Sequence, residues 1–280
     1  MFQEYLHALR KRNPLIHSIT NYVTVTDCAN ILLACGASPI MADDPLEAAE
    51  ITAGCSGLNL NMGTLSPSRV SAMLQAGKKA NELGHPVVLD PVGVGASSFR
   101  RETAGTLLHS LRFTAVRGNL SEILTLAGGR GRCRGVDAAD GIHRENFQEI
   151  ARFAMDFSEE IGAIVIISGE IDLAADARQA FCIFNGSPMM RRVTGTGCQL
   201  SALTAAFLAA NPQSPLEASA AAVCTMGVAG ELAARRLGSL DGTMTYRNYI
   251  IDAVSRLDGA ELEEMADYRI LRREESRCTM

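Results

Sequence analysis

The sequence predicts an α/β protein whose central, mostly parallel sheet is covered by helices on both faces and whose C-terminal part is helical. Two observations support this prediction. Short apolar or β-branched runs alternate with longer helical patterns along the chain, which is the order of elements in an α/β fold. Several runs, such as "PVVLD" at 86–90, are apolar on both faces, as strands buried inside a parallel sheet are.

The expected strands are short runs rich in Val, Ile, Leu and Phe that are bounded by turn-forming residues. In chain order they are 14–19, 37–41, 57–62, 86–90, 113–118, 163–169 and 179–184. Between them, apolar residues recur at helical spacing. The helices expected there are 22–35, 45–54, 66–83, 101–111, 119–127 and 145–161.

The last third of the chain is expected to be almost entirely helical. Helix begins near Thr196 and includes the Ala-rich stretch 215–237, where neighbouring helices can approach closely. No Pro/Ser-rich linker or internal repeat interrupts the pattern, so residues 1–280 are expected to form a single domain. The charged tail after Tyr268, "RILRREESRCTM", is expected to be frayed or disordered.

Composition favours a small-molecule partner over nucleic acid or a membrane. With 47% hydrophobic residues the chain can bury a large core, and it shows neither a signal-peptide pattern nor an apolar run of spanning length. A formal net charge of -5 without a basic cluster gives no electrostatic footprint for nucleic acid. The eight cysteines contain no C-x-x-C pair, which suits reduced thiols in a cytoplasmic protein.

Ligand sites in open α/β sheets lie at the carboxyl ends of the strands, and the first informative strand end is Asp90. In "VVLDPVGVGASSFR" an apolar strand ends at Asp90 and breaks into Pro91, Gly93 and Gly95. The carboxylate at this tip can hold a cation. A plain strand-to-helix turn, in which Asp90 caps the backbone, explains the same pattern.

The second strand end is "AVRGNLSEI", which offers Arg117, Asn119 and Glu122. A guanidinium at a strand end is well shaped to clamp phosphate. The spacing of Asn119 and Glu122 is that of a capping box at a helix start, which is a purely structural alternative.

The third stretch is "VTGTGCQLSALTAAF", where a glycine-rich turn precedes a long apolar helix. Gly195 and Gly197 permit close backbone approach, and the helix is expected to begin near Thr196 or Gly197. The unpaired N–H groups and positive end of the helix dipole make this turn a site for an anion. Cys198 lies in the first turn, where a thiol is expected to have a lowered pKa. The alternative is a small buried residue packed against the sheet.

The sequence motifs of several other common binding and catalytic sites are absent. The chain contains no G-x-x-x-x-G-K-[ST] loop, and "GVGASS" lacks the final glycine of a dinucleotide fingerprint. Neither a zinc-ligand spacing nor a G-x-S-x-G elbow is present, and the five histidines are scattered.

Seven ordered stretches between Asn13 and Met226 resemble the hydroxyethylthiazole kinases, which belong to the ribokinase-like group. They are "NPLIHSITNYVT", "GASPIMA", "LNLNMGTL", "VVLDPVGVGASSFR", "AVRGNLSEI", "ISGEIDL" and "VTGTGCQLSALTAAF". The resemblance implies a ribokinase-like fold and ATP- and Mg²⁺-dependent phosphorylation of 4-methyl-5-(2-hydroxyethyl)thiazole. It also implies a homotrimer with active sites at the subunit boundaries.

The resemblance also implies roles for residues on the nucleotide side. "RGNLSE" is similar to the N-x-x-E element of the ribokinase-like group, in which Asn119 and Glu122 organise magnesium and phosphate. Arg117 matches an ATP-contacting arginine, and Asp90 matches the acidic residue of the Mg-phosphate region. Ser168 stands where a threonine often contacts ATP, and this departure keeps the hydroxyl.

On the acceptor side, Met41 and Gly195 match positions that touch the thiazole, and Asn21 and Val23 resemble the wall of the substrate pocket. Without the resemblance, core packing is the preferred reading of Met41. Most ribokinase-like enzymes carry aspartate where this chain has Cys198, as the thiazole kinases do.

We assign Cys198 to placing the substrate hydroxyl, with base catalysis as the weaker alternative, because a thiolate is a weak base for an alcohol. Phosphoryl transfer passes through a loose transition state in which positioning and charge neutralisation dominate. The amides of the loop from Gly195 through Thr196 and Gly197 to Cys198 would stabilise charge on the transferred group.

Three other functions remain open at this point. A kinase of the same fold could act on another small alcohol, such as a hydroxymethylpyrimidine or a sugar. A non-catalytic sensor could bind the thiazole or the nucleotide with the same loops, although it would not need the magnesium residues. A cysteine-dependent transferase could use Cys198 as a nucleophile, but the sequence offers no candidate base beside it.

Overall fold

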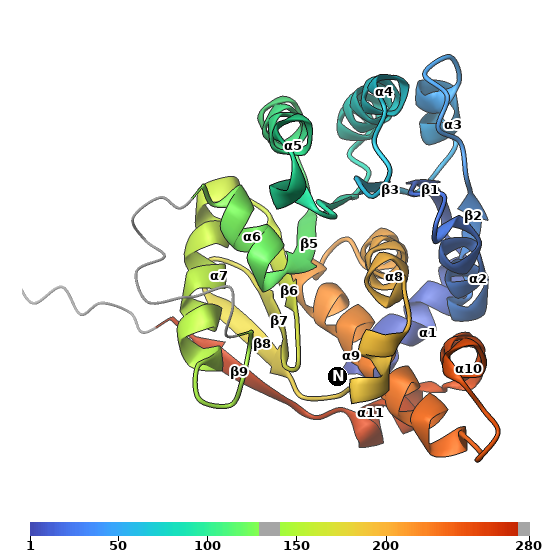
Figure 1. Cartoon of the computed structure of the whole chain (residues 1–280). Helices are drawn as coiled ribbons and strands as arrows, with labels where there is room; N and C mark the ends of the chain where they lie inside the picture. The colour runs from blue at the N-terminus through green and yellow to red at the C-terminus, as the bar shows by residue number, and fades with distance from the viewer. Residues whose placement is uncertain (129–140, 274–280) are drawn as a thin grey trace, which may run out of the picture.

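A computed structural model describes residues 1–128 and 141–273. In this part of the chain a nine-stranded sheet runs in the order β2-β1-β3-β4-β5-β6-β7-β8-β9 (Figure 1). The strands are β1 Leu15–Ile19, β2 Ser38–Ile40, β3 Gly57–Asn61, β4 Val87–Asp90, β5 Ala115–Asn119, β6 Ile164–Ser168, β7 Asp172–Ala175, β8 Gln179–Ile183 and β9 Tyr268–Arg272. Strands β1 to β6 pair in parallel, and β7, β8 and β9 continue the sheet antiparallel. The predicted mostly parallel α/β class is confirmed.

All seven strands expected from the sequence are present, with ends that differ by one or two residues, and β7 and β9 were not expected. The expectation of a disordered tail after Tyr268 is wrong for its first residues, because Tyr268–Arg272 forms β9 and pairs with β8. The rest of that tail, from residue 274, lies outside the described residues. Strand β9 is an edge strand, so its exposed arginine side chains reach solvent.

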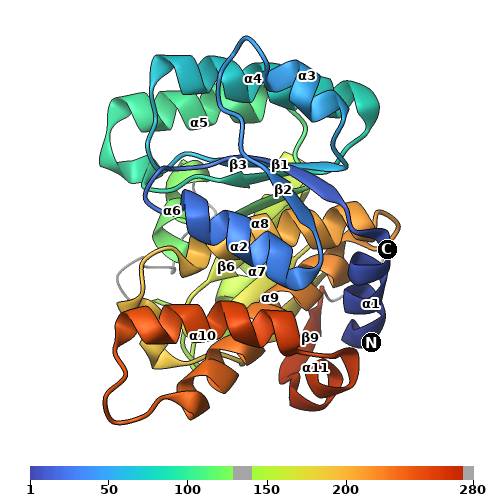
Figure 2. The same cartoon turned by 90° about the vertical axis from the view of Figure 1, so that its right-hand side faces the viewer.

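Helices cover both faces of the sheet. They are α1 Phe2–Arg12, α2 Val25–Cys35, α3 Ala48–Ala53, α4 Pro67–Leu83, α5 Ser98–Ser110, α6 Leu120–Leu126, α7 Phe147–Ile161, α8 Thr196–Ala210, α9 Pro215–Arg236, α10 Thr243–Arg256 and α11 Gly259–Met265. Helices α3 to α7 lie on one face, and α1, α2 and α8 to α11 lie on the other (Figure 1). Figure 2 shows α3, α4 and α5 above strands β1 and β3, with α2, α8 and α10 below them. Helix α1 was not predicted, although Phe2, Leu6 and Leu9 form its buried stripe.

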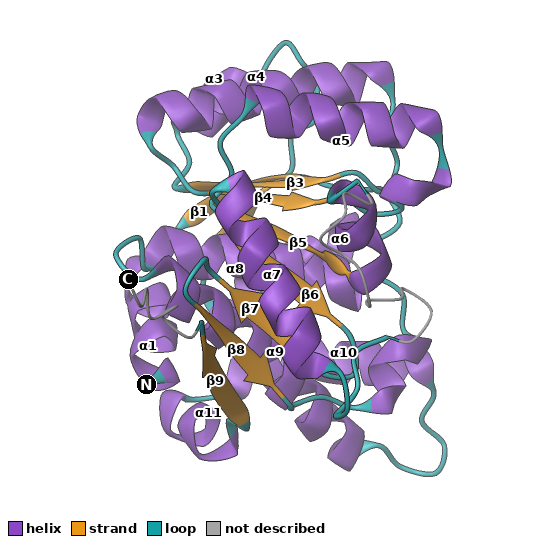
Figure 3. Ribbon diagram, turned by 90° about the vertical axis from the view of Figure 1, so that its left-hand side faces the viewer, coloured by secondary structure: helices purple, strands orange, loops and turns teal. Residues whose placement is uncertain are grey.

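Two cores sit on opposite faces of the sheet because successive side chains of a strand point to opposite sides. In β4, Val88 joins the core under α8, whereas Val87 and Leu89 join the core under α4 and α5. Figure 3 shows the sheet from the α5 and α7 side, with α8 and α9 behind it. The strands are therefore buried on both faces, as their apolar runs predicted.

Helix α9 crosses the middle of one core layer. Among the described helices it alone is long and apolar enough to span a membrane, but 83% of its most apolar window is buried inside the molecule. A core helix passes the same test of length and hydropathy, so this finding gives little support to a membrane span.

Candidate active site

The site residues predicted on the nucleotide side and Cys198 come together where four parallel strands end beside the start of α8. In the sheet register Asn61 at the end of β3 is paired with Asp90 at the end of β4, and Asn119 of β5 is paired with Ser168 of β6. Helix α8 packs across β3 and β4. The carboxyl edge of the sheet therefore supplies the polar side chains, and α8 supplies a helix N-terminus.

Close approach requires glycine at two positions at the start of α8, the N-cap Gly195 and Gly197 in the first turn. Gly195 is the N-cap with φ 89°, and a Cβ atom there would lie 2.5 Å from Cγ2 of Thr24. At Gly197 a Cβ atom would lie 2.3 Å from Nη1 of Arg117. The expected close backbone approach is confirmed, and the loop is held against α2 on one side and β5 on the other.

The backbone at the start of α8 presents unpaired donors. Its first helical bond runs from the N–H of Gln199 to the carbonyl of Gly195 at 2.9 Å. The N–H groups of Thr196, Gly197 and Cys198 precede that bond and have no partner within the helix. Together with the helix dipole they favour a negative charge at this point.

Arg117 lies directly beneath the α8 loop. Its side chain is nearly buried, and Nη2 donates to the hydroxyl of Ser168. Nη1 lies 3.9 Å from Oδ2 of Asp90. The buried Nε–H has no hydrogen-bond partner among the described residues. A guanidinium with an unused donor at a helix N-terminus suits a phosphate oxygen.

Asp90 is fully buried, and one of its two oxygens is unpartnered. Oδ2 accepts from Nδ2 of Asn61 at 2.7 Å and from the hydroxyl of Ser201 at 2.8 Å, whereas Oδ1 has no partner within the described residues. Burial raises the pKa of Asp90 to about 6; the nearby Arg117 lowers that pKa, and Glu122 raises it. The carboxylate therefore combines a raised pKa with one oxygen that lacks a hydrogen bond.

Cys198 is buried in the first turn of α8, as expected, but its expected lowered pKa is wrong. Burial raises the pKa of Cys198, and the charge of Asp90 raises it further. Amide N–H groups of Asn21 and Asn61 each lie 3.3 Å from Sγ and act in the opposite direction. Desolvation outweighs the helix terminus because the sulfur has little contact with water.

Asn119 and Glu122 form the capping box that the sequence allowed. The side chain of Asn119 accepts from the N–H of Glu122 at 2.9 Å, and Oε2 of Glu122 accepts from the N–H of Asn119 at 2.9 Å. Oε1 of Glu122 also accepts from the N–H of Gly93 at 2.8 Å. The structural role is present, and the carboxylate stands close enough to Asp90 to raise its pKa.

These residues fit a Mg²⁺ ion that is completed by water and phosphate. No cluster of three or more His, Cys, Asp or Glu side chains suited to a metal occurs in residues 1–128 and 141–273. Mg²⁺ commonly uses one or two carboxylates together with waters and substrate phosphates. The free Oδ1 of Asp90 and the adjacent Glu122 carboxylate are one such pair.

The residues expected to line the thiazole pocket differ in how deeply they are buried. Asn21 is buried against Cys198. Thr24, three residues after Asn21, is the residue that Gly195 contacts. Met41, after β2, is half-buried against the core under α8. Val23 is 59% exposed, so in a single chain it forms an open edge rather than a wall.

Two buried residues of the site were missed by sequence reasoning. Asn61 donates to both Asp90 and Cys198, and Ser201 donates to Asp90. A signal for Asn61 existed, because "LNLN" alternates polar and apolar residues in a strand that is otherwise apolar on both faces. Ser201 lies one turn after Gly197, on the same face of α8.

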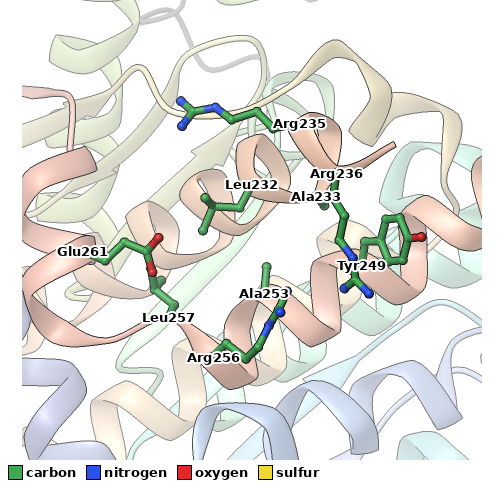
Figure 4. A pocket seen from close by; sticks show the side chains of 9 residues that line it. All are labelled: Leu232, Ala233, Arg235, Arg236, Tyr249, Ala253, Arg256, Leu257 and Glu261. Carbon is green, nitrogen blue, oxygen red and sulfur yellow. The ribbon is translucent and has the colours of Figure 1, made fainter. Parts of the chain in front are cut away.

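One cavity lies elsewhere, between α9, α10 and α11. It has a volume of about 490 Å³ and is lined by Leu232, Ala233, Arg235, Arg236, Tyr249, Ala253, Arg256, Leu257 and Glu261 (Figure 4). No predicted site residue is among these. Within it Arg236 stacks 3.9 Å above the Tyr249 ring and is paired with Asp252, so its charge is already engaged.

Comparison with known proteins gives one consistent family. The model of the Hydroxyethylthiazole kinase family matches residues 6–260. The chain is 56% identical over 270 residues to a hydroxyethylthiazole kinase of Clostridium acetobutylicum, covering 96% of this chain and 99% of that protein. It is 45% identical over 277 residues to one of Desulfovibrio desulfuricans, covering 95% and 97%.

Solved structures agree with the sequence comparison. The structure of hydroxyethylthiazole kinase from Pyrococcus horikoshii OT3 is similar with a TM-score of 0.86 at 34% identity, covering 96% of this chain and 98% of that one. An ADP/ATP-dependent NAD(P)H-hydrate dehydratase of Bacillus subtilis, co-crystallized with ATP/Mg2+, is similar with a TM-score of 0.55 at 13% identity. It covers 88% of this chain and 90% of that one, and this likeness shows the fold alone.

Proposed function

The chain belongs to the hydroxyethylthiazole kinase family, and from this membership we propose a role for each residue of its candidate active site. The protein phosphorylates the hydroxyl of 4-methyl-5-(2-hydroxyethyl)thiazole in thiamine salvage. ATP is the co-substrate, as a kinase family implies. We further propose that residues 1–280 act as a single kinase domain.

Arg117, Ser168 and Asn119 are assigned to ATP. The support is the nearly buried guanidinium of Arg117, which is held by Ser168 and keeps an unused Nε–H beside the N-terminus of α8. A planar donor fork can bind two phosphate oxygens at once. Ser168 and Asn119 are paired in the sheet register, so both residues lie at the carboxyl ends of neighbouring strands.

Asp90 and Glu122 are assigned to Mg²⁺, with Asn119 acting through water. The support is the Oδ1 of Asp90, which has no hydrogen-bond partner among the described residues, and the nearby Glu122 carboxylate, whose charge raises the pKa of Asp90. A bound Mg²⁺ neutralises charge on the phosphates. It would also complete the unsatisfied oxygen of Asp90, which is costly to leave buried without a partner.

The loop from Gly195 through Thr196 and Gly197 to Cys198 is assigned to the transferred phosphoryl group and the acceptor hydroxyl. Its free N–H groups stabilise the charge that develops during transfer. Cys198 places the hydroxyl and does not remove its proton at neutral pH, because burial raises the thiol pKa. The hydroxyl proton can leave late in a loose transition state.

Met41, Gly195, Asn21 and Val23 are assigned to the thiazole, within a homotrimer that has sites at subunit boundaries. The support for the assembly is the exposure of Tyr22 (71%) and Val23 (59%) directly after the buried Asn21. Large apolar side chains exposed beside a binding residue are typical of an interface. Six cysteines of the described chain are free thiols, which supports a reducing, cytoplasmic location.

The observation that best supports this function is the convergence of Asp90, Arg117 and Cys198 at one helix N-terminus. The test is ADP release from ATP and Mg²⁺ by the purified protein, measured with the thiazole alcohol, a hydroxymethylpyrimidine and a sugar in turn. We expect release with the thiazole alcohol and only background with the others. Equal or faster release with the pyrimidine or the sugar would assign another acceptor, and binding without ADP release would indicate a sensor.

A further inference from the structure

We propose that Asn61 is a positioning residue that locks the Cys198 sulfur and the Asp90 carboxylate into one fixed arrangement. This inference rests on the role proposed above for Cys198 in placing the acceptor hydroxyl. Asn61 is 2% exposed at the end of β3, and its Nδ2 lies 2.7 Å from Oδ2 of Asp90 and 3.3 Å from Sγ of Cys198. One amide group therefore joins the acceptor side of the site to the phosphate side.

The orientation of the Asn61 amide is fixed by its partners. The backbone N–H of Gly63 can only donate, and it lies 2.9 Å from Oδ1 of Asn61. The oxygen must face Gly63, so Nδ2 must face Asp90 and Cys198. Both hydrogens of this amide are then used, one on the carboxylate and one on the sulfur.

A second amide supports the first. Oδ1 of Asn21 accepts from the N–H of Thr24 at 3.1 Å, so its Nδ2 is directed at Oδ1 of Asn61, 2.9 Å away, and at Sγ of Cys198. Only glycine at position 63 leaves room for Asn21 in this arrangement, because a Cβ atom there would lie 2.6 Å from Cβ of Asn21. The two amides thus form a closed clamp on the sulfur.

The clamp also decides which oxygen of Asp90 is available. Asn61 and Ser201 both donate to Oδ2, which leaves Oδ1 as the oxygen without a partner. Burial of all these groups makes their geometry rigid, because breaking any one contact strands a polar atom away from water. Asn61 therefore sets the spacing between the thiol that places the acceptor and the carboxylate that faces the phosphates.

Aspartate, an apolar residue or serine would not fill this role at position 61. Aspartate would remove both N–H donors and bring a second negative charge to the place 2.7 Å from Asp90. An apolar residue would leave Asp90 and Cys198 each without one donor. Serine keeps a single donor on a shorter arm and can serve only one of the two partners.

The chain contains a matched control two residues earlier. Asn59 lies on the same face of β3 and is fully buried, but its Nδ2 donates to the hydroxyl of Ser18 at 3.0 Å and contacts neither Cys198 nor Asp90. Loss of the Asn59 amide removes one buried hydrogen bond, to Ser18, whereas loss of the Asn61 amide removes four. Loss of the Asn59 amide does not change the clamp.

The test is a double-mutant cycle on kcat with full-length protein. We expect Asn61→Ala to lower kcat for the thiazole alcohol by about tenfold or more with a smaller change in KM for ATP, and Asn59→Ala to keep kcat within about twofold. Combined with Cys198→Ala, the Asn61→Ala substitution should cost less than about threefold further, because the sulfur that Asn61 positions is already gone. Asn61→Ser keeps one donor, so its kcat should lie between that of wild type and that of Asn61→Ala. It replaces Asn61→Ala in the cycle if the alanine variant does not fold.

The outcomes separate this inference from the proposed function. If Cys198→Ala alone keeps full activity, the proposed role of Cys198 is wrong. If Cys198→Ala is impaired but Asn61→Ala costs the same factor in both backgrounds, that role stands and the clamp is overturned. Equal losses of kcat in Asn59→Ala and Asn61→Ala, with equal falls in Tm, would also overturn the clamp, because both substitutions would then act as simple packing defects.

Discussion

Gly197 lies directly against Arg117: a Cβ atom at position 197 would stand 2.3 Å from Nη1 and 2.9 Å from Cζ of the guanidinium. Any side chain at 197 must therefore move Arg117 or the start of α8. Because Arg117 is held by Ser168 and nearly buried, it has little room to move sideways. The glycine thus keeps the guanidinium and the helix N-terminus in contact.

We predict that Gly197→Ala raises KM for ATP by about tenfold, because it displaces the proposed phosphate-binding group. The control is Gly105→Ala in α5, where a Cβ atom meets nothing within 4 Å. That substitution should leave the kinetics unchanged and stabilise the protein by about 0.5–1 kcal/mol, since alanine favours helix. Wild-type KM for ATP in Gly197→Ala would show that Arg117 does not contact the nucleotide.

The next prediction concerns Glu122, whose two oxygens accept from the N–H groups of Gly93 and Asn119. We expect Glu122→Gln to lower kcat by about tenfold or more at limiting Mg²⁺, with part of the loss recovered at higher Mg²⁺. Glutamine loses the charge and also turns its NH₂ group toward one of the two donors. Stability should therefore fall by about 0.5–2 kcal/mol as the capping box weakens.

Magnesium titration separates the two effects in Glu122→Gln. A lost cap lowers Tm at every Mg²⁺ concentration, whereas a lost metal ligand changes the Mg²⁺ dependence of kcat. Glu102→Gln, on the exposed face of α5, should change neither quantity. An unaltered Mg²⁺ dependence in Glu122→Gln would leave the residue with only its structural role.

We further predict that His17 makes folding stability sensitive to acid. His17 is fully buried, with Nε2 2.7 Å from the carbonyl of Ala42 and Nδ1 2.8 Å from the hydroxyl of Thr52. Burial lowers the pKa of His17 below its usual 6.5. Below pH 6.5 the unfolded chain then binds a proton that the folded state resists, so stability falls as pH decreases from there toward the lowered pKa.

Urea unfolding at about pH 7 and about pH 5.5 measures this effect. The His17→Gln variant is less stable at neutral pH, but it should lose less on acidification than wild type. His109→Gln, at an exposed position of α5, should keep the wild-type difference between the two pH values. A His17→Gln variant with an unchanged pH difference would assign the acid sensitivity to other groups.

The fold could be predicted where local pattern and tertiary environment agree. Runs such as Val87–Asp90 are apolar on both faces and are buried on both faces. Strand β9 was missed because Arg269 and Arg272 resemble a solvated tail, and only pairing with β8 makes Tyr268–Arg272 a strand. Edge strands carry such charges, so composition alone could not separate the two cases.

The site could be predicted to the same extent. The rule that ligands lie at carboxyl strand ends selects Asp90, Arg117 and Asn119 as candidates, because it depends only on chain order. It does not find Ser201, whose role depends on α8 packing across β4. The direction of the Cys198 pKa was wrong for the same reason: a helix N-terminus is visible in the sequence, whereas burial beside Asp90 is not.

The last prediction asks what the Cys198 sulfur does. Amide hydrogens of Asn21 and Asn61 both point at Sγ, and burial raises the thiol pKa, so the sulfur is a poor base at neutral pH. A group that only places the hydroxyl can be replaced by another polar group of similar size. We therefore expect Cys198→Ser to keep kcat within about tenfold of wild type.

Cys198→Asp should be tolerated or faster, because a carboxylate accepts both amide hydrogens and can take the hydroxyl proton. Repulsion from Asp90 opposes this change, and the N-terminus of α8 offsets it by about 1 kcal/mol. Cys35→Ser, another buried thiol that donates to the carbonyl of Leu32 at 3.1 Å, is the control and should keep wild-type kcat. Measurement of kcat for all three variants, with mass spectrometry of the wild type during turnover, decides the role. Complete loss in Cys198→Ser together with a trapped covalent adduct would identify the sulfur as a nucleophile, whereas retained activity in both Cys198 variants requires direct transfer to a hydroxyl that position 198 merely holds in place.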